Sequence, residues 1–242
     1  MARIVCVTGA AGGIGAATSR AFAAEGATLI LLDQNTADLG GANGISLTAD
    51  LSDPNAVRNC FAKVSEVFGQ LDALINVAGI NHRSPIATME LAFWTRMMDV
   101  NVGAMFLTAK YGMPLLEKGE SPVIINMSSI SGHVASADYP AYVTTKAAVE
   151  SLTIALAGEV AARGIRVNAI APGWVDAGFT HAAMATMQNP SVLVTKAEAA
   201  HLMGRMANPA EIATAIRWLA SPKASFVTGQ VLFVDGGLMR VH

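Results

Sequence analysis

The chain alternates short apolar runs with longer amphipathic ones along its length, and this rhythm constrains its fold more than any other feature. Runs rich in Val, Ile and Leu predict strands at residues 3–7, 28–32, 44–48, 73–76, 123–127, 166–170 and 230–234. Helical periodicity lies between them, at residues 13–25, 54–68, 90–118, 141–163 and 209–220. Near-continuous apolar strands separated by helices are typical of a parallel sheet covered on both faces. The sequence therefore predicts one α/β domain over residues 1–242, doubly wound, with a seven-stranded, mostly parallel sheet.

Composition limits the classes of partner that the chain can bind. Of its 242 residues, 52% are hydrophobic and only 14% are charged, against about a quarter charged in an average domain. The net charge is −2 and no block of Lys and Arg stands out, so we expect neither nucleic acid nor an anionic membrane surface as a partner. The shortage of charge suggests that surface is hidden between subunits, and we expect a homo-oligomer.

No segment predicts export or membrane insertion. The apolar start at residues 1–7 is too short for a signal peptide, and charged residues interrupt the later apolar stretches. Cys6 and Cys60 lie far apart without motif spacing, which is typical of buried thiols in an intracellular protein. We therefore expect a cytoplasmic protein.

A glycine-rich stretch at residues 8–15 follows the first predicted strand and opens the first predicted helix. Gly9, Gly13 and Gly15, with Ile14 between the last two, allow a tight turn and a close approach of the backbone to a pyrophosphate. The N–H groups at the start of the helix would bind the phosphates. Glycines alone could form a structural turn, but the order of strand, loop, helix, strand and acidic residue favours a Rossmann-type dinucleotide-binding domain.

The acidic residue in that order is Asp33, at the end of the second predicted strand. Its carboxylate can accept hydrogen bonds from the adenosine ribose and would repel the 2′-phosphate of NADP. Neither Gln34 nor Asn35 is basic, so we predict NAD as the cofactor. Asp50 and Leu51, after the third predicted strand, are placed to meet the adenine, or alternatively form a simple turn.

Tyr142 and Lys146 are four residues apart in a helical pattern and therefore share one face. An ammonium close to a phenol favours the phenolate and lowers a pKa that starts near about 10. Such a phenol can act as general base in alcohol oxidation or as general acid in ketone reduction. The pair alone is weak evidence, because this spacing also occurs by chance on solvated helices.

Further motifs strengthen the pair because they occur in a fixed order along the chain: residues 8–15, residues 76–79, Asn101, Ser129, Tyr142 with Lys146, and residues 233–237. With them the chain resembles the short-chain dehydrogenase/reductase family over essentially its whole length. The resemblance implies that Ser129 binds the substrate oxygen and that Tyr142 is the acid/base. It also implies that Lys146 lowers the tyrosine pKa and binds the nicotinamide ribose, and that Asn101 holds a water of the proton relay.

The resemblance assigns the segment at residues 76–79 to the sheet edge beside the cofactor. Asn76, Ala78 and Gly79 match the family's pattern there. Val77 stands where a second Asn is common, which changes little in the expected role.

The resemblance also implies a loop whose backbone meets the nicotinamide carboxamide. Pro172, Gly173 and Val175 match that loop. A Thr is usual two residues after Val175, but this chain has Ala177. We expect the side-chain hydrogen bond of that Thr to be lost or to be supplied by Thr180.

Residues 172–205 break the alternation, because they contain no clear strand and are rich in Met, Ala and His. Long insertions in compact domains are often lids or binding loops. We expect a substrate-binding loop or lid, and the alternative is a surface helical excursion with no ligand role.

The segments expected to face the nicotinamide carry a mixed polar set: His82, Arg83, His133, Asp138, Trp174 and His181. Such a set suits a small hydroxylated substrate, such as a sugar, a polyol or a hydroxy acid. Among these residues we expect His133, Trp174 and His181 to contact the substrate, although rim positions are the alternative for each.

The sequence thus predicts an NAD-dependent oxidoreductase that interconverts a secondary alcohol and a ketone. One alternative is a 3-oxoacyl thioester reductase of the same family, which Asp33 and the lack of a basic patch disfavour. Another is a non-catalytic dinucleotide sensor or scaffold, which the presence of Ser129, Tyr142 and Lys146 disfavours. The histidines show no ligand spacing, so we expect no metal. The resemblance implies a tetramer that packs through the helices at residues 90–118 and 141–163.

Overall fold

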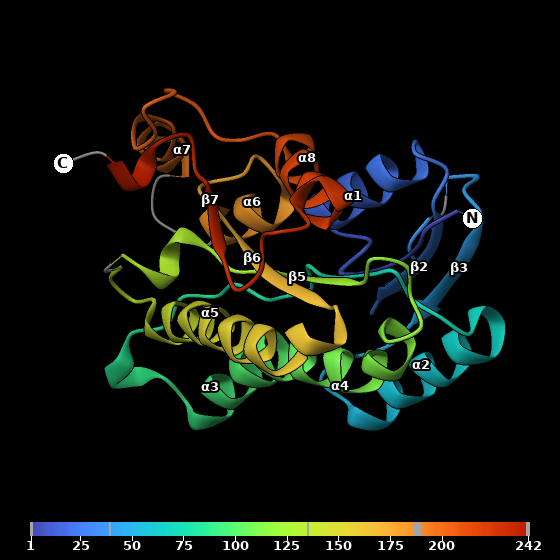
Figure 1. Ribbon diagram of the computed structural model, residues 1–242. Coiled ribbons are helices and arrows are strands. Elements are labelled where there is room, and N and C mark those ends of the chain that lie inside the picture. The colour runs from blue at the N-terminus through green and yellow to red at the C-terminus, as the bar shows by residue number, and fades with distance from the viewer. Residues whose placement is uncertain (1, 39, 135, 186–189, 241–242) are drawn as a thin grey trace.

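The computed structural model describes residues 2–38, 40–134, 136–185 and 190–240, which form a sheet between two layers of helices (Figure 1). The sheet has seven strands in the order β3-β2-β1-β4-β5-β6-β7, and every neighbouring pair is parallel. The strands are β1 Ile4–Thr8, β2 Thr28–Asp33, β3 Gly44–Thr48, β4 Ala73–Asn76, β5 Val123–Met127, β6 Arg166–Pro172 and β7 Val231–Val234. The predicted α/β fold and its seven strands are confirmed.

The helices divide between the two faces of the sheet. They are α1 Gly13–Ala23, α2 Pro54–Phe68, α3 Leu91–Met98, α4 Ala104–Leu116, α5 Pro140–Val160, α6 Gly178–Ala185, α7 Pro190–Ala199 and α8 Pro209–Ala220. Helices α1 and α8 pack together on one face, and α2, α4 and α5 cover the other (Figure 1). The predicted covering of both faces is therefore confirmed.

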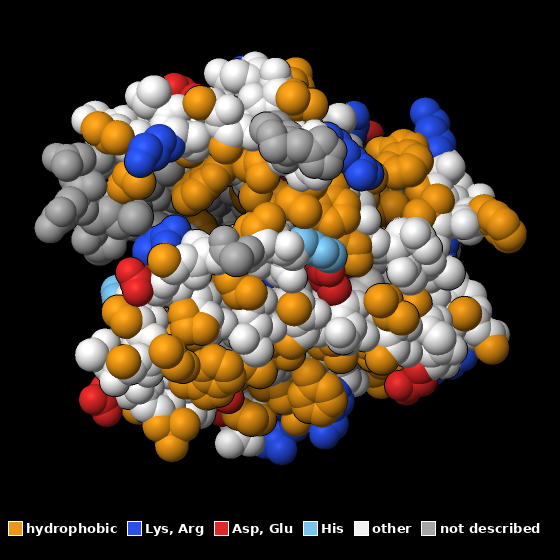
Figure 2. Space-filling model, turned by 90° about the vertical axis from the view of Figure 1, so that its left-hand side faces the viewer, with side chains coloured by type: hydrophobic (Ala, Val, Ile, Leu, Met, Phe, Trp, Pro, Cys, Tyr) orange, Lys and Arg blue, Asp and Glu red, His pale blue; other side chains and the backbone are white. Residues whose placement is uncertain are grey.

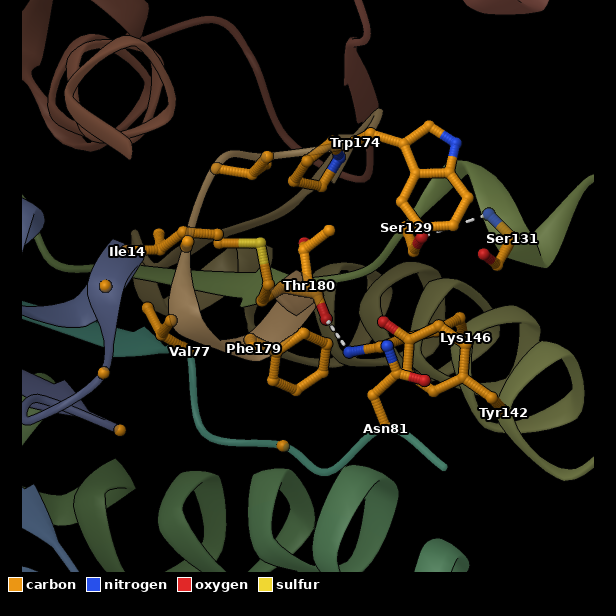
Figure 3. A pocket seen from close by; sticks show the side chains of 18 of the residues that line it. Ile14, Val77, Asn81, Ser129, Ser131, Tyr142, Lys146, Trp174, Phe179 and Thr180 are labelled. Carbon is orange, nitrogen blue, oxygen red and sulfur yellow. Dashed lines mark hydrogen bonds between the residues drawn. The ribbon is translucent and has the colours of Figure 1, made fainter. Parts of the chain in front are cut away.

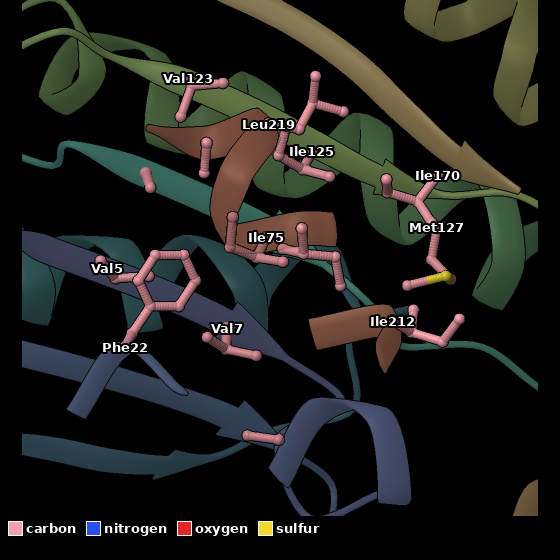
Figure 4. Close-up of a cluster of buried hydrophobic side chains, with 14 of the residues drawn as sticks. Val5, Val7, Phe22, Ile75, Val123, Ile125, Met127, Ile170, Ile212 and Leu219 are labelled. Atoms are coloured by element: carbon pink, nitrogen blue, oxygen red, sulfur yellow. The ribbon is translucent and has the colours of Figure 1, made fainter. Parts of the chain in front are cut away.

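Alternation along each strand supplies both layers of the core. Val5 and Val7 of β1 pack with Phe22 and Ile212 on the side of α1 and α8 (Figure 4). Cys6, between them, joins the cluster on the opposite face. Because successive strand residues point to opposite sides, a strand buried on both faces must be apolar throughout.

Two helix starts follow from local chemistry visible in the sequence. Asp53 caps α2 by accepting a hydrogen bond from the Asn55 N–H, and Pro54 occupies the first turn, where it loses no helical hydrogen bond. Asn208 and Glu211 form a capping box at the start of α8. The Asn208 side chain accepts backbone N–H groups of the first turn, and the Glu211 carboxylate accepts the Asn208 N–H.

The predicted helix at residues 90–118 is interrupted. It consists of α3, a π-helical turn at Asp99–Gly103, and α4. A π-helical turn holds one residue more than an α-helical turn, and such turns are frequent at functional sites. The turn carries Asn101 into the interior, where it is fully buried.

The segment at residues 172–205 contains α6 and α7 and has one isolated parallel bridge, between Val175 and Ala207. Its first part borders the cleft described below, through residues that include Trp174, Phe179 and Thr180. Its role as a lid stays a prediction.

No helix in the described part of the chain is long and apolar enough to cross a membrane. Cys6 and Cys60 are both buried free thiols. The cytoplasmic location stays a prediction.

Candidate active site

A cleft of about 530 Å³ opens beside the carboxyl ends of the central strands. The sheet order places β2 on one side of β1 and β4 on the other, so the loops that follow β1 and β4 diverge there. Parallel sheets bind ligands at this kind of crevice. Figure 2 views this end of the molecule, where hydrophobic side chains border a hollow. The loops after β1, β4, β5 and β6 and the start of α5 contribute its walls.

The glycine loop forms one end of the cleft. Gly9 has φ +64°, and a Cβ there would lie 2.8 Å from backbone atoms of Ala78. A Cβ on Gly15 would overlap the Gly9 carbonyl. Helix α1 starts after Gly12, whose lack of a side chain leaves the first N–H groups without a side-chain cap. This cradle fits a pyrophosphate, because helical N–H groups and their dipole bind anions.

Asp33 lies beside that loop at the end of β2. One carboxylate oxygen accepts from the Ala11 N–H at 3.0 Å and the other from the Asn35 N–H at 2.9 Å. The carboxylate therefore ties the glycine loop to β2 while it lines the cleft.

Asp50 and Leu51 are outside the residues that line the cleft. The Asp50 carboxylate accepts from Ser52 and pairs with Arg96 at 3.1 Å, which lowers its pKa. Leu51 is buried in the core. Their contact with adenine stays a prediction without support from this placement.

Tyr142 lies in the first turn of α5 and is buried to 6% exposure. Its ring stacks on that of Tyr139, with centroids 4.7 Å apart. Burial raises the pKa of the Tyr142 phenol, and an interaction with the Ser129 hydroxyl acts in the opposite direction. The expected lowering of this pKa does not occur in this structure, because desolvation of the phenolate outweighs the other effects.

Lys146 is buried one turn further along α5, with 3% exposure. Its Nζ donates to the Met127 carbonyl at 2.8 Å and lies 5.5 Å from the centroid of the Tyr142 ring. Burial lowers the pKa of the ammonium to about 8. The expected closeness of the two side chains is therefore present.

The two serines after β5 have different surroundings. Ser129 is half-buried, lines the cleft and accepts the Ser131 N–H at 3.1 Å. Ser128 is buried, and its hydroxyl lies 2.7 Å from Glu150 Oε1. Of these two serines, Ser129 is the less buried, and its contact with a substrate oxygen stays a prediction.

Asn101 joins two elements beneath the cleft. Its Nδ2 donates to the Ile80 carbonyl at 3.0 Å and to Thr145 Oγ1 at 3.1 Å, and its Oδ1 accepts the Ile80 N–H at 2.7 Å. A Cβ on Gly79 would lie 3.1 Å from that Oδ1. The side chain therefore holds the loop after β4 against α5. Its role in a proton relay stays a prediction.

The segment after β4 reaches the cleft through Val77, Ala78 and Gly79. The Thr8 hydroxyl accepts the N–H groups of Val77 and Ala78, both at 3.1 Å. Asn76 is buried and donates to Asn126 Oδ1 at 3.0 Å, so it supports the sheet rather than lining the cleft.

Comparisons with known proteins agree with this geometry. Residues 9–239 match a family model described as enoyl-(acyl carrier protein) reductase. The chain is 36% identical to cis-4-hydroxycyclohexanecarboxylate dehydrogenase of Sinomonas cyclohexanicum, over 99% of this chain and 97% of that one. It is 33% identical to a 3-oxoacyl-(acyl-carrier-protein) reductase of Thermotoga maritima, over 98% of both chains. This chain belongs to the short-chain dehydrogenase/reductase family.

A solved structure supports the same conclusion. The ligand-free aldohexose dehydrogenase of Thermoplasma acidophilum superposes with a TM-score of 0.93 at 32% identity, covering 100% of this chain and 95% of that one. Members of the family are oxidoreductases that use nicotinamide dinucleotides.

In this short-chain dehydrogenase/reductase, Pro172, Gly173 and Val175 line the cleft at the end of β6, and their contact with a nicotinamide stays a prediction. Ala177 lies where the family's Thr is usual, and a Cβ on Gly13 would come within 2.8 Å of its Cβ. Thr180 is buried and also lines the cleft. Whether Thr180 replaces the missing hydroxyl stays a prediction.

The three residues expected to contact substrate are placed differently from one another. Trp174 lines the cleft, and Figure 3 shows its indole above Ser129. His133 lies outside the cleft lining and contacts Glu150 Oε2 at 2.6 Å. His181 is exposed and pairs with Asp176 at 2.8 Å. The structure thus brings only Trp174 to the cleft.

Sequence reasoning missed three residues near the site. Tyr139 stacks on Tyr142, and no local pattern marks it. Glu150 holds Ser128 and His133, and its position four residues after Lys146 was an available signal. His201 is buried and accepts the Trp174 N–H on Nε2 at 3.2 Å, while its Nδ1 lies 2.7 Å from the Ala197 carbonyl.

No group of three metal-ligating side chains occurs among the residues that the structure describes.

Proposed function

We propose that this protein is an NAD-dependent oxidoreductase that interconverts a secondary alcohol and a ketone on a small hydroxylated substrate: a sugar, a polyol or a hydroxy acid. The observation that carries the proposal is the meeting of Tyr142, Ser129 and Lys146 in one cleft that begins at the glycine loop. The related proteins named above include dehydrogenases of a hydroxycyclohexanecarboxylate and of an aldohexose, which supports this substrate range.

The nicotinamide, when bound, supplies or accepts the hydride. The side chains manage the proton and the oxygen. Because burial raises its pKa, the Tyr142 phenol carries its proton at neutral pH and can donate it to a carbonyl oxygen during reduction. In oxidation the phenol must first lose its proton to solvent, and the resulting phenolate then takes the proton from the substrate hydroxyl. Ser129 holds the reacting oxygen, and Lys146 would bind the nicotinamide ribose as a cation near Tyr142.

The preference for NAD rests on the end of β2. Asp33 lines the cleft beside Gln34 and Asn35, and none of these three residues is basic. The 2′-phosphate of NADP would therefore be repelled by the Asp33 carboxylate, with no positive charge from these residues to offset the repulsion. A fluorescence titration with NADH and NADPH tests this preference, and tighter binding of NADPH would contradict it.

The proton chemistry is tested by Tyr142→Phe. We expect the variant to lose about 10²–10⁴-fold in the rate of NADH formation, which is the usual contribution of a general acid/base, with the NADH dissociation constant nearly unchanged. Tyr111→Phe is the matched control, because Tyr111 packs against the core on α4 and is outside the cleft lining. Turnover retained by Tyr142→Phe would overturn the assignment.

A reductase of 3-oxoacyl thioesters is the second candidate, because several of the relatives carry that name. Such an enzyme would be expected to prefer NADPH and to present a basic surface to its carrier. A screen with NAD against polyols, sugars, hydroxy acids and secondary alcohols, beside an acetoacetyl thioester with NADPH, separates the two. Turnover of the thioester alone would favour the reductase, and no turnover at all would favour a non-catalytic sensor or scaffold.

We also propose a homotetramer that packs through α4 and α5. Phe106 on α4 and Ile154 on α5 are 50% and 57% exposed, so these two helices offer apolar side chains that a partner subunit could cover. Light scattering coupled to size exclusion measures the assembly. A monomer at micromolar concentration would contradict this proposal.

A further inference from the structure

Three charged side chains line the cleft among the described residues: Asp33, Arg83 and Lys146. Asp33 stands at the adenosine end, and Lys146 belongs to the catalytic pair. Arg83 comes from the loop after β4, and neither the proton chemistry nor cofactor binding gives it a role. A half-buried guanidinium in a cleft needs either a structural or a ligand-binding explanation.

The guanidinium is part of a stack that ends at the catalytic phenol. Arg83 Cζ lies 4.2 Å above the Tyr139 ring, and that ring stacks on Tyr142 with centroids 4.7 Å apart. The Tyr139 hydroxyl donates to Asn81 Oδ1, which fixes the middle ring. Arg83 therefore lies one aromatic ring beyond Tyr142 in this stack.

The hydrogen bonds of Arg83 leave one edge available. Nη1 donates to the Ala137 carbonyl at 2.9 Å and to Ser136 Oγ at 3.4 Å. Nε and Nη2 have no hydrogen-bond partner within the described residues, and no Asp or Glu there forms an ion pair with Arg83. An Arg has five N–H donors in a fork that matches a carboxylate. The anchored Nη1 thus orients the remaining edge.

The surroundings indicate the rest of the ligand. Trp174 and Phe179 line the cleft near the catalytic residues (Figure 3), and the Phe179 ring lies 6.4 Å from that of Tyr142. These rings suit an apolar body. A single guanidinium matches one negative charge better than the two of a phosphate monoester, which usually takes more donors.

We propose that Arg83 is the specificity-determining residue of this site and that the substrate is a hydroxy acid whose carboxylate it binds. The inference rests on the proposed function and narrows its substrate class. Because Tyr139 separates the guanidinium from Tyr142, the spacing favours an acid whose carboxylate is several bonds from the carbinol carbon over a 2-hydroxy acid.

The test compares charged and neutral substrates of one shape. The probes are 4-hydroxycyclohexanecarboxylate, its carboxamide and lactate, each with NAD, and the measurement is kcat/KM from NADH absorbance. We expect the wild type to prefer the carboxylate over the carboxamide by about 10- to 100-fold, the usual effect of a hydrogen bond to a charged group. Lactate should be a poor substrate. If its kcat/KM equals or exceeds that of 4-hydroxycyclohexanecarboxylate, the inference that the carboxylate lies several bonds from the carbinol carbon is wrong.

Arg83→Gln should lower kcat/KM for the carboxylate, mainly through KM, by much more than it lowers kcat/KM for the carboxamide, so that the preference for the carboxylate is lost. Arg83→Lys, which keeps the charge, should retain part of the preference. Arg217→Gln is the matched control, because Arg217 pairs with Glu25 on the outside of α8 and lies outside the cleft lining. If Arg83→Gln lowers kcat/KM equally for both substrates, Arg83 only supports the loop at residues 136–138 and the proposal is wrong.

A binding measurement separates this inference from the proposed function. Calorimetry with cyclohexanecarboxylate and NADH needs no turnover, and we expect binding to weaken by about 10-fold or more in Arg83→Gln. Should the protein oxidise none of the alcohols, the proposed function would fall while the calorimetry still decides on Arg83. Equal binding by wild type and Arg83→Gln would overturn the inference, as would a wild-type preference for the carboxamide.

Discussion

The buried ammonium of Lys146 should make the protein less stable than it would be without it. Burial lowers the pKa of this group from 10.5 to about 8, and each pKa unit corresponds to about 1.4 kcal/mol. The folded state therefore gives up about 3 kcal/mol when Lys146 is charged in both states, that is, below pH 8. Between pH 8 and 10.5 the unfolded chain binds more protons than the folded one, so stability rises with pH in that window.

Replacing Lys146 by Met removes the charge and keeps a long, flexible side chain. We expect the difference in unfolding free energy, variant minus wild type, to be larger at pH 7 than at pH 10 by about 2–3 kcal/mol. Loss of the hydrogen bond to the Met127 carbonyl shifts that difference by a similar amount at both pH values. Turnover should be lost, so Lys146→Met would be a more stable protein without activity.

The measurement is urea unfolding at one fixed protein concentration, at several pH values from 7 to 10, with the slopes compared between proteins. Lys63→Met is the matched control, because Lys63 is exposed on α2 and pairs with the exposed Glu66. Its stability relative to wild type should not vary with pH by more than a few tenths of a kcal/mol, as for other exposed pairs (~0.5 kcal/mol). A pH-independent difference for Lys146→Met would refute the reasoning.

Two further substitutions test the walls of the cleft. Gly9→Ala should destabilise the protein by about 1–3 kcal/mol and weaken NADH binding, because the new Cβ would press on the Ala78 backbone. Gly26→Ala is the control: with φ +77° and open space around it, it should show only the cost of backbone strain. Equal effects of the two substitutions on NADH binding would contradict this prediction. His201→Leu should lower the unfolding free energy by about 1–3 kcal/mol for each backbone group that it leaves unpaired, at Trp174 and Ala197. It should also raise KM for the substrate, because His201 positions Trp174. If both the urea unfolding and KM stay unchanged, that positioning role is wrong.

The parts of the fold that sequence could predict are those that local chemistry decides. The strands were visible because both faces are buried, so each strand is apolar throughout. The starts of α2 and α8 were visible because Asp53 and Asn208 satisfy helix N–H groups within a few residues. The glycine loop was visible because Gly9 and Gly15 lie where a Cβ cannot fit.

The site was harder to predict wherever contacts between distant segments decide the chemistry. His133 was expected at the substrate because it is near Ser129 in sequence, but it contacts the Glu150 carboxylate on α5 and lies outside the cleft lining. The direction of the Tyr142 pKa was wrong because the sequence shows the nearby ammonium and not the depth of burial. Arg83 was recognised as polar, but its stacking on Tyr139 depends on a turn more than fifty residues away.

The π-helical turn at Asp99–Gly103 has a consequence for anyone who redesigns this protein. Deleting one residue there would restore regular α-helical hydrogen bonding and would look favourable by helix propensity alone. Because each residue of an α-helix advances it by roughly 100°, the deletion would turn either α3 or α4 by that angle relative to the sheet. Asn101 could then no longer reach both Ile80 and Thr145. The π-helical turn therefore sets the rotation of α3 relative to α4. A regular α-helix in its place would release the loop after β4 that borders the cleft.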